Sequence, residues 1–193
     1  MKISSNRLLI VPLVKNELLS LLQSPQAYAQ ETGYKVDNFE INPTHCEEIS
    51  ETIEKYPHEW VNNSNDYLFY TLWLIVEKQS SQLVGKFQFN GHPNHDGEVE
   101  VFFGIEPRYR RNGFGCEAMN AIIDWSSKNN LFKKLLIEAD FENKAAMASL
   151  KKLNFKRVCN VDEEEEINLS TKFYKKIEQS DKPDDNISLD FET

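Results

Sequence analysis

Residues 98–139 restrict the fold of this chain more than any other segment. Residues 98–105 begin with polar–apolar alternation and are rich in Val and Phe, which predicts a strand that Pro107 ends. Residues 113–130 carry apolar side chains at helical spacing, and the Leu- and Ile-rich residues 134–139 predict a second strand. A strand, a helix and a strand in this order favour a parallel crossover within one sheet.

Further strands and helices are predicted on both sides of this crossover. The predicted strands are residues 7–12, 71–77, 83–89, 155–159 and 171–177, and the predicted helices are residues 15–31, 44–61 and 143–154. Short loops join the strands that precede the crossover, which favours an antiparallel meander. The expected fold class is therefore α+β (mixed α/β), with a central mixed sheet of about seven strands, largely antiparallel and flanked by helices.

A basic turn that contains two glycines lies between the strand and the helix of the crossover. It consists of Arg110, Arg111, Asn112, Gly113, Phe114 and Gly115. Glycine lets the backbone approach a ligand closely, and the first turn of a helix offers unpaired N–H groups at the positive end of its dipole. The two arginines add cationic donors. The turn therefore favours a phosphate or pyrophosphate ligand, whereas glycines that serve only to turn the chain are the other explanation.

Two other phosphate-binding patterns fit this turn less well. The P-loop pattern Gly-x-x-x-x-Gly-Lys-Ser/Thr is absent from the sequence. Residues 113–118 satisfy the dinucleotide pattern Gly-x-Gly-x-x-Ala, and Glu138 and Asp140 lie roughly where a ribose-binding acid would fall. However, the pattern follows an antiparallel meander here, and too few parallel strands remain for two βαβ halves. A dinucleotide-dependent enzyme is thus the less favoured alternative.

The net charge of −9 is concentrated toward the C-terminal end of the sequence. Residues 162–193 contain eleven acidic residues and four lysines, a net charge of −7, so residues 1–161 carry only about −2. Nucleic-acid binding requires a basic face, so we expect no nucleic-acid partner. An acidic surface instead favours a cationic partner such as an amine or a polyamine.

We expect a cytoplasmic protein with a disordered C-terminal tail. No apolar run approaches the roughly 20 residues that span a bilayer, so no membrane association is expected, and the first residues lack the apolar region of a signal peptide. Three widely spaced cysteines fit free thiols in a reducing compartment. Residues 179–193 are polar and acidic, which leaves residues 1–178 as the predicted single domain.

The turn and its surroundings resemble the motifs of the GNAT acetyltransferase superfamily. The Arg-x-x-Gly-x-Gly pattern within residues 110–115 resembles the Gln/Arg-x-x-Gly-x-Gly/Ala signature that grips the pyrophosphate of coenzyme A. Residues 143–155 resemble the later Asn-x-x-Ser…Lys-x-Gly-Phe motif. Residues 7–13 resemble the opening strand of the branch that includes ribosomal-protein N-terminal acetyltransferases. The match covers most of residues 7–177 and is least clear over residues 25–65.

The resemblance implies a function and roles for particular residues. It implies transfer of an acetyl group from acetyl-CoA to a primary amine by direct attack in a ternary complex, without a metal. The strands at 98–105 and 134–139 would splay apart, and the pantetheine arm would lie between them. The residues implied to bind the cofactor are Phe103 and Ile105 through backbone groups, Arg110, Arg111, Asn112, Gly113, Phe114 and Gly115 at the pyrophosphate, and Asn143. Glu100 would remove a proton from the amine.

Three positions depart from the family's pattern. The family's serine is Ala146, its glycine is Asn154, which can still adopt a left-handed conformation, and the tyrosine that often protonates the leaving thiolate falls at Leu150. A module that binds acyl-CoA without catalysis is therefore the alternative. The acceptor is expected to contact residues 25–65 and 90–97, which carry no motif, so a protein N-terminus, a polyamine, an amino acid and an aminoglycoside all fit. The resemblance also leaves a homodimer open.

Several other residues invite a functional interpretation that we consider weaker. Glu98 shares a face with Glu100 about 7 Å away, at a rise of ~3.3 Å per residue, and we expect these like charges to raise one pKa modestly. His92 and His95 lie in a loop without a convincing third ligand, so no metal is expected. Cys116 is interpreted as a small helix residue. Trp60, Trp73 and Trp125 are interpreted as core or cleft lining.

Overall fold

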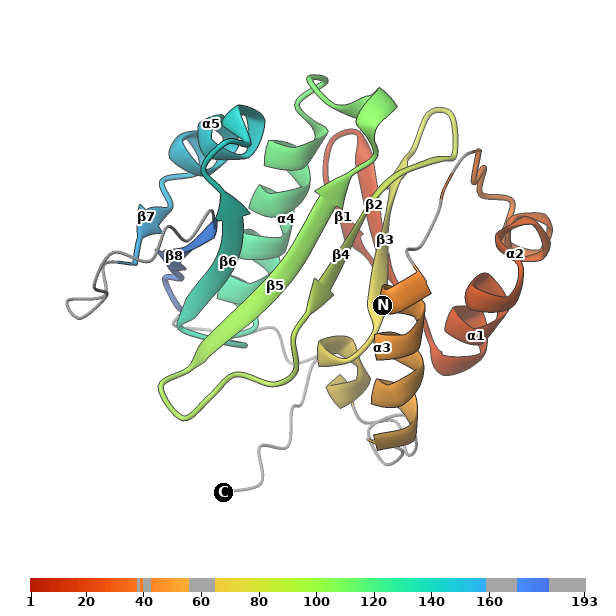
Figure 1. Ribbon diagram of the computed structural model, residues 1–193, viewed down its shortest axis with the longest axis horizontal. Helices are drawn as coiled ribbons and strands as arrows, with labels where there is room; N and C mark the ends of the chain where they lie inside the picture. The colour runs from red at the N-terminus through yellow and green to blue at the C-terminus, as the bar shows by residue number, and fades with distance from the viewer. Residues whose placement is uncertain (38, 40–42, 56–64, 159–169, 181–193) are drawn as a thin grey trace.

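The computed structural model describes residues 1–37, 39, 43–55, 65–158 and 170–180 (Figure 1). Within these ranges the strands are β1 Ile3–Ser4, β2 Leu8–Pro12, β3 Leu72–Glu77, β4 Gln82–Phe89, β5 Glu98–Ile105, β6 Lys134–Asp140, β7 Lys156–Arg157 and β8 Ser170–Lys176. The helices are α1 Lys15–Gln23, α2 Pro25–Thr32, α3 Pro43–Lys55, α4 Phe114–Lys128 and α5 Lys144–Lys152, with the 3₁₀ helices η1 Asn65–Phe69 and η2 Pro107–Tyr109. None of these described helices has the length and apolar character needed to cross a bilayer.

One sheet contains all eight described strands, in the order β1-β2-β3-β4-β5-β6-β8-β7. Every neighbouring pair is antiparallel except β5 and β6, which are parallel and are connected through α4. The predicted fold class, the antiparallel meander and the single parallel crossover are therefore confirmed. The eighth strand is β1, and its two residues are too few to show a period-two pattern in the sequence.

Helices cover both faces of the sheet, so the chain has two apolar cores (Figure 1). On one face, side chains of α4 and α5 such as Met119 and Leu150 pack with Trp73 of β3. On the other face, side chains of α1, α2 and α3 pack with Leu72 and Leu74 of the same strand. This two-sided burial explains why β3 is apolar without alternation, since both faces of a central strand are removed from water.

The parallel pair does not continue to the ends of its strands. Its register runs from Glu98 opposite Lys134 to Val101 opposite Ile137. Beyond this point β5 pairs with β4 alone, and β6 pairs with β8 alone. The two strands consequently diverge toward the end of the sheet where α4 begins, as Figure 1 shows. This is the splay that the family resemblance implied.

Several predicted helix boundaries differ in the structure, for reasons that lie in the local sequence. The predicted helix 15–31 is wrong as one element, because α1 ends at Gln23 and α2 begins at Pro25. Proline lacks an N–H and disfavours a helical conformation at the preceding residue, and Ser24 is extended there. The Ser24 hydroxyl accepts a hydrogen bond from the Ala27 N–H at 3.2 Å and so caps α2. Residues 56–61 of the predicted helix 44–61 lie outside the described residues.

The last predicted helix ends as its sequence suggests. Asn143 is the N-cap of α5, and its side chain accepts a hydrogen bond from the Ala146 N–H at 3.1 Å. Asn154 follows the helix with a φ of 59°, so it adopts the left-handed conformation expected where the family has glycine. The strand that follows is shorter than predicted, because β7 contains only Lys156 and Arg157, and Cys159 lies outside the described residues.

The body of the fold extends two residues past the predicted domain boundary. The Ser180 N–H donates to the Ser127 carbonyl at 3.1 Å and to the Asn130 side-chain oxygen at 2.8 Å. The Asn130 side-chain amide donates in turn to the Ser180 carbonyl at 3.0 Å. These contacts attach Ser180 to the end of α4, whereas most of the predicted tail, residues 181–193, lies outside the described residues.

We predict different effects for two C-terminal truncations. A chain ending at Ser180 should keep the free energy of unfolding of the full chain, because the deleted residues are polar and acidic. A chain ending at Glu178 should lose about 1–2 kcal/mol, since a hydrogen bond contributes a net ~1 kcal/mol. Urea unfolding of both chains measures this difference. A clear loss of stability in the chain ending at Ser180 would show that residues 181–193 pack on the body.

Candidate active site

The open edge of β5 presents backbone groups that no strand among the described residues pairs. The Glu100 carbonyl accepts from the Asn90 N–H at 2.8 Å, and the Glu106 N–H donates to the Val84 carbonyl at 2.9 Å, so both residues face the β4 side. Backbone groups alternate along a strand, so those of Phe103 and Ile105 face the opposite side, where β6 has diverged. The Ile105 carbonyl accepts from Arg110 Nε at 2.9 Å.

The basic turn is held in an unusual backbone conformation at the start of α4. Arg111 and Gly113 both have a positive φ, of 65° and 79°. Gly113 is the N-cap of α4 and provides no side-chain hydrogen bond to the helix. The first N–H groups of a helix have no intrahelical partner, so they remain available to an anion. Arg110 and Asn112 are exposed beside them.

Close packing joins this turn to the open edge of β5. A Cβ atom added to Gly115 would lie 3.6 Å from both Ile105 Cγ1 and the Phe103 ring. The first turn of α4 therefore lies directly against the end of β5. Phe114 differs from its neighbours in the turn, because its side chain is buried in the core. Only its backbone can take the role predicted for it.

An ion pair that we did not predict attaches the first turn of α4 to the start of β2. Glu117 accepts from the Arg7 N–H and from Arg7 Nε, both at 2.7 Å, and from the Ser5 hydroxyl at 2.8 Å. The Arg7 guanidinium also lies 4.6 Å from the centre of the Phe114 ring. Burial of the Glu117 carboxyl would raise its pKa, but the hydrogen bonds from Arg7 and Ser5 lower the pKa below its ordinary value. No sequence spacing links residues so far apart.

Asn143 lies across the splay from the basic turn. It lies between the end of β6, the strand that forms the other side of the opening, and the start of α5. Its side chain is exposed, and its oxygen caps α5 as described above. The structure thus places the predicted cofactor residues around one opening. Leu150, which stands where many family members have tyrosine, is buried in the core instead.

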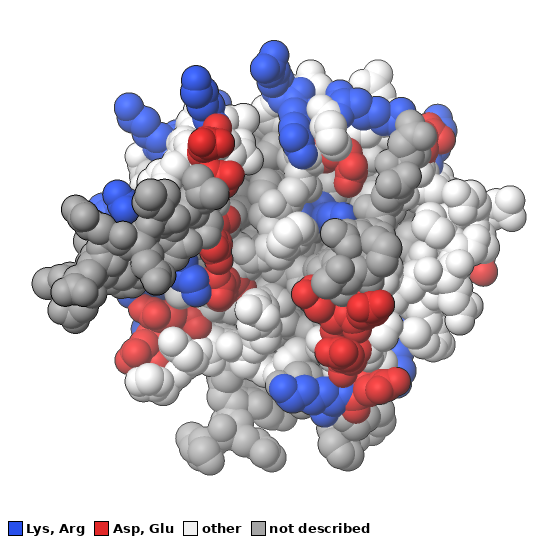
Figure 2. Space-filling view, viewed as in Figure 1, with Lys and Arg blue, Asp and Glu red and all other residues white. Residues whose placement is uncertain are grey.

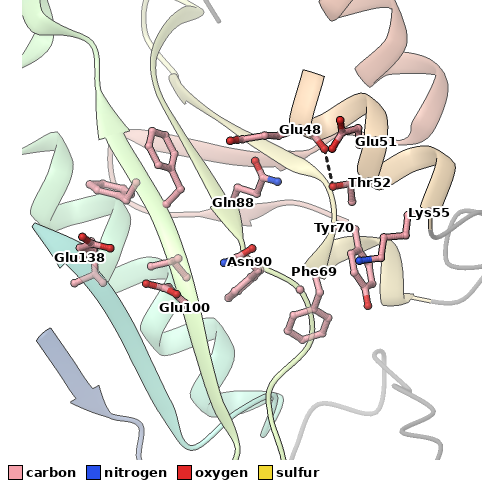
Figure 3. A pocket seen from close by; sticks show the side chains of 16 residues that line it. Glu48, Glu51, Thr52, Lys55, Phe69, Tyr70, Gln88, Asn90, Glu100 and Glu138 are labelled. Atoms are coloured by element: carbon pink, nitrogen blue, oxygen red, sulfur yellow. Dashed lines mark hydrogen bonds between the residues drawn. The ribbon is translucent and has the colours of Figure 1, made fainter. Parts of the chain in front are cut away.

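A pocket of about 710 Å³ lies on the face of the sheet that carries α3 (Figure 3). Side chains and backbone of α3, η1, β4, β5 and β6 line it. The lining residues are Glu48, Glu51, Thr52, Lys55, Phe69, Tyr70, Gln88, Phe89, Asn90, Gly91, Glu100, Val101, Phe102, Phe103, Ile137 and Glu138. Four of these are carboxylates and one is a lysine, so the pocket is acidic. Its lining includes residues of both regions predicted to contact the acceptor, 25–65 and 90–97.

The charges around the site are separated by sign (Figure 2). Acidic side chains flank the centre of the displayed face on two sides, and Lys and Arg side chains gather along the upper rim, where α4 and α5 begin. Arg110, Arg111 and Lys144 are exposed at these helix starts. This distribution suits an anionic group at the rim and a cationic group in the pocket.

Glu100, the predicted base, lines the pocket and is paired with a lysine of β8. Lys172 Nζ lies 3.2 Å from both carboxylate oxygens of Glu100. Glu98 has a lysine partner too, since it accepts a hydrogen bond from Lys134, and this bond lowers the pKa of Glu98. Each of the two glutamates is therefore balanced by its own lysine. This arrangement does not support the expected repulsion between the Glu98 and Glu100 carboxylates.

The tryptophans and histidines singled out in the sequence form no metal-binding group among the described residues. Trp73 and Trp125 pack edge to face with ring centroids 5.2 Å apart, which confirms their assignment to the core or cleft lining, while Trp60 lies outside the described residues. His92 lies 3.6 Å from Asp66 and packs on aromatic rings. His95 is exposed. The described residues contain no group of three or more His, Cys, Asp or Glu that could hold a metal ion.

The chain matches a known protein family and a curated relative. The Acetyltransferase (GNAT) domain matches residues 7–156. An uncharacterized N-acetyltransferase of Bacillus subtilis, YjdG, is 26% identical over 126 residues, which are 65% of this chain and 72% of that protein.

Solved structures share the fold at low sequence identity. A ribosomal L7/L12 α-N-protein acetyltransferase, RimL, solved in complex with coenzyme A, matches with a TM-score of 0.62 and 12% identity over 93% of this chain and 100% of its own. A spermidine/spermine N-acetyltransferase, SpeG, from Vibrio cholerae matches with a TM-score of 0.56 and 18% identity over 88% and 92% of the two chains. The splayed strands and the turn before α4 agree with the family match over residues 7–156. The chain therefore belongs to the GNAT family of N-acetyltransferases.

Proposed function

We propose that this chain transfers the acetyl group of acetyl-CoA to a cationic amine that enters the acidic pocket. One observation carries the proposal: the opening between β5 and β6 leads from the basic turn at the start of α4 to the pocket. Phe103 belongs to both regions, since it packs against Gly115 and lines the pocket. A cosubstrate held at the turn by its phosphates could therefore deliver its thioester to the acceptor.

The residues at the turn fit the phosphate end of coenzyme A. The unpaired N–H groups at the start of α4 and the positive end of its dipole would face the pyrophosphate, and Arg110 and Arg111 would add charge. Glu117 would otherwise repel an anion at the first turn of α4, but it is held by Arg7 and Ser5. The open edge of Phe103 and Ile105 would pair with the amides of the pantetheine arm, much as a strand pairs with a neighbour.

Glu100 would act on the acceptor amine. An amine must lose a proton before it can attack a thioester, and the carboxylate of Glu100 would accept that proton directly or through a water molecule. The nitrogen would then attack the carbonyl carbon, the C–S bond would break, and coenzyme A would leave. Leu150 is buried and its hydrocarbon side chain has no ionisable group, so it offers no proton to the departing thiolate. We therefore assign proton return to solvent.

The acceptor class follows from the pocket's charge. Glu48 and Glu51 of α3 form one wall, and Glu100 and Glu138 of the central strands form the opposite wall. Two acidic walls favour an acceptor with a second positive charge beyond its reactive amine. The likeness to SpeG, whose substrates include spermidine, agrees with a polyamine or a similar polycation. A protein N-terminus that carries a nearby basic residue is the second candidate, in agreement with the likeness to RimL.

The phosphate assignment predicts a charge-specific loss of cofactor binding. Asn112→Asp adds a negative charge to the turn without changing the side chain's shape, and we expect at least a tenfold loss of affinity for coenzyme A, since repulsion of about 1.4 kcal/mol suffices. Asn120→Asp is the matched control, because Asn120 is exposed on α4 and lies farther from the turn. Isothermal titration calorimetry measures both. Equal affinities in the two variants would contradict phosphate binding at the turn.

The base assignment predicts a change in rate without a change in cofactor affinity. Glu100→Gln should lower kcat about 10²-fold, the low end for general-base catalysis, and should leave the affinity for coenzyme A unchanged. Glu98→Gln is the matched control, since Glu98 lies on the same face and also pairs with a lysine. The test is a pH–rate profile with an active amine. If both variants retain full kcat, Glu100 has a structural role.

The acceptor assignment predicts an effect that depends on substrate charge. Glu51→Gln should raise KM for spermidine about three- to tenfold and leave KM for a monoamine such as propylamine nearly unchanged, because only the polyamine places a distal charge near α3. Glu54→Gln is the control, since Glu54 is exposed on α3 but does not line the pocket. Steady-state kinetics at low salt measure these effects. Equal changes for the two amines would contradict recognition of a distal charge.

A further inference from the structure

The carboxylate proposed as the catalytic base already holds a primary amine of the protein itself. Lys172 Nζ is 3.2 Å from both oxygens of Glu100, within hydrogen-bonding range. A primary ammonium beside this carboxylate is the arrangement that the proposed function requires of an acceptor. Lys172 therefore lies where an acceptor amine would lie. The inference drawn from this position rests on the proposed function.

The sheet register places Lys172 on the pocket side of the opening. Lys172 of β8 lies opposite Glu138 of β6, and Leu136 of β6 lies opposite Glu100 of β5. Residues paired across strands share a face, so Lys172, Glu138 and Glu100 project from the same face. Glu138 and Glu100 both line the pocket. The Lys172 side chain thus crosses β6 to reach the pocket edge.

The same register places this amine at the start of the splay. The parallel ladder ends at Val101, one residue after Glu100. Phe102, the next pocket residue on the same face, lies about 7 Å from Glu100 at a rise of ~3.3 Å per residue. A thioester delivered through the opening would lie in this region. The flexible stem of a lysine can cover such a distance by rotation.

The Lys172 side chain is free to make that movement. It is 49% exposed and Glu100 is 27% exposed. Ion pairs at this exposure contribute little to stability, so the amine can leave the carboxylate and return to it easily. Lys134 gives a useful contrast, because it forms a similar pair with Glu98 on the same face. Its pair lies at the closed start of the parallel ladder, away from the opening.

We propose that Lys172 is a self-acetylation site and that its amine occupies the position of the acceptor ammonium in the free enzyme. The Lys172 ammonium gives a proton to Glu100, and its nitrogen attacks the thioester carbonyl of bound acetyl-CoA. A C–N bond forms and the C–S bond breaks, and the products are N-acetyl-lysine, free coenzyme A and one proton. Acetylation removes the positive charge of Lys172 and so leaves Glu100 without its cation.

The test is peptide mass spectrometry of the full chain incubated with acetyl-CoA and no amine, sampled over time. We expect acetylation of Lys172 at least tenfold faster than that of Lys134 and of Lys176, which is exposed on the same strand and reports spontaneous reaction. The rate constant should not depend on protein concentration, because the transfer occurs within one chain. Glu100→Gln and Asn112→Asp should each slow it at least tenfold, and Lys172→Arg should remove the product.

Three outcomes would overturn the inference, and the first two separate it from the proposed function. Acetylation of Lys172 no faster than that of Lys176, in an enzyme that binds coenzyme A and acetylates an added amine, would refute self-acetylation alone. A rate constant that rises with protein concentration would refute transfer within one chain. If the chain neither binds coenzyme A nor acetylates any amine of a mixed panel, the proposed function and this inference fail together.

Discussion

The site depends on the point where the parallel pairing of β5 and β6 stops. After Val101 and Ile137 the two strands take different partners, because β5 remains paired with β4 while β6 remains paired with β8. A buried backbone edge would be costly without a partner, so such an edge is kept only where solvent or a ligand can satisfy it. The right-handed crossover through α4 returns the chain to this same end of the sheet, which brings the start of the helix next to the opening.

Electrostatics then give the two ends of the opening different characters. The start of α4 combines helix N–H groups with exposed arginines, whereas the pocket is lined by carboxylates from α3, β5 and β6. An anionic cosubstrate and a cationic acceptor can thus approach from separate sides without competing for one charge. Three glutamates of this region are each held by a basic partner: Glu117 by Arg7, Glu98 by Lys134 and Glu100 by Lys172. Of these pairs, the one at Glu100 lies at the pocket.

Packing explains how the basic turn is held beside the opening. Gly115 lets the first turn of α4 lie against Phe103 and Ile105, and Arg7 and Ser5 hold the same turn through Glu117. The turn is therefore fixed to β5 on one side and to the start of β2 on the other. Groups that bind a ligand gain affinity when they are held in place beforehand, because less freedom is lost on binding.

The order of strands and helices, the crossover and the basic turn were determined by the sequence, because each depends on local periodicity, proline, glycine or capping residues. Asn143 at the start of α5 and Asn154 after its end are examples, since their roles follow from their immediate neighbours. The break between α1 and α2 at Pro25 has the same local origin, although the predicted helix 15–31 is continuous there. Only the tertiary structure decided which side chains meet across the fold. Arg7 with Glu117, and Lys172 with Glu100, are separated by 110 and 72 residues, and no local pattern encodes such contacts. Long-range pairs depend on sheet register and strand order, which arise from the burial of the whole chain.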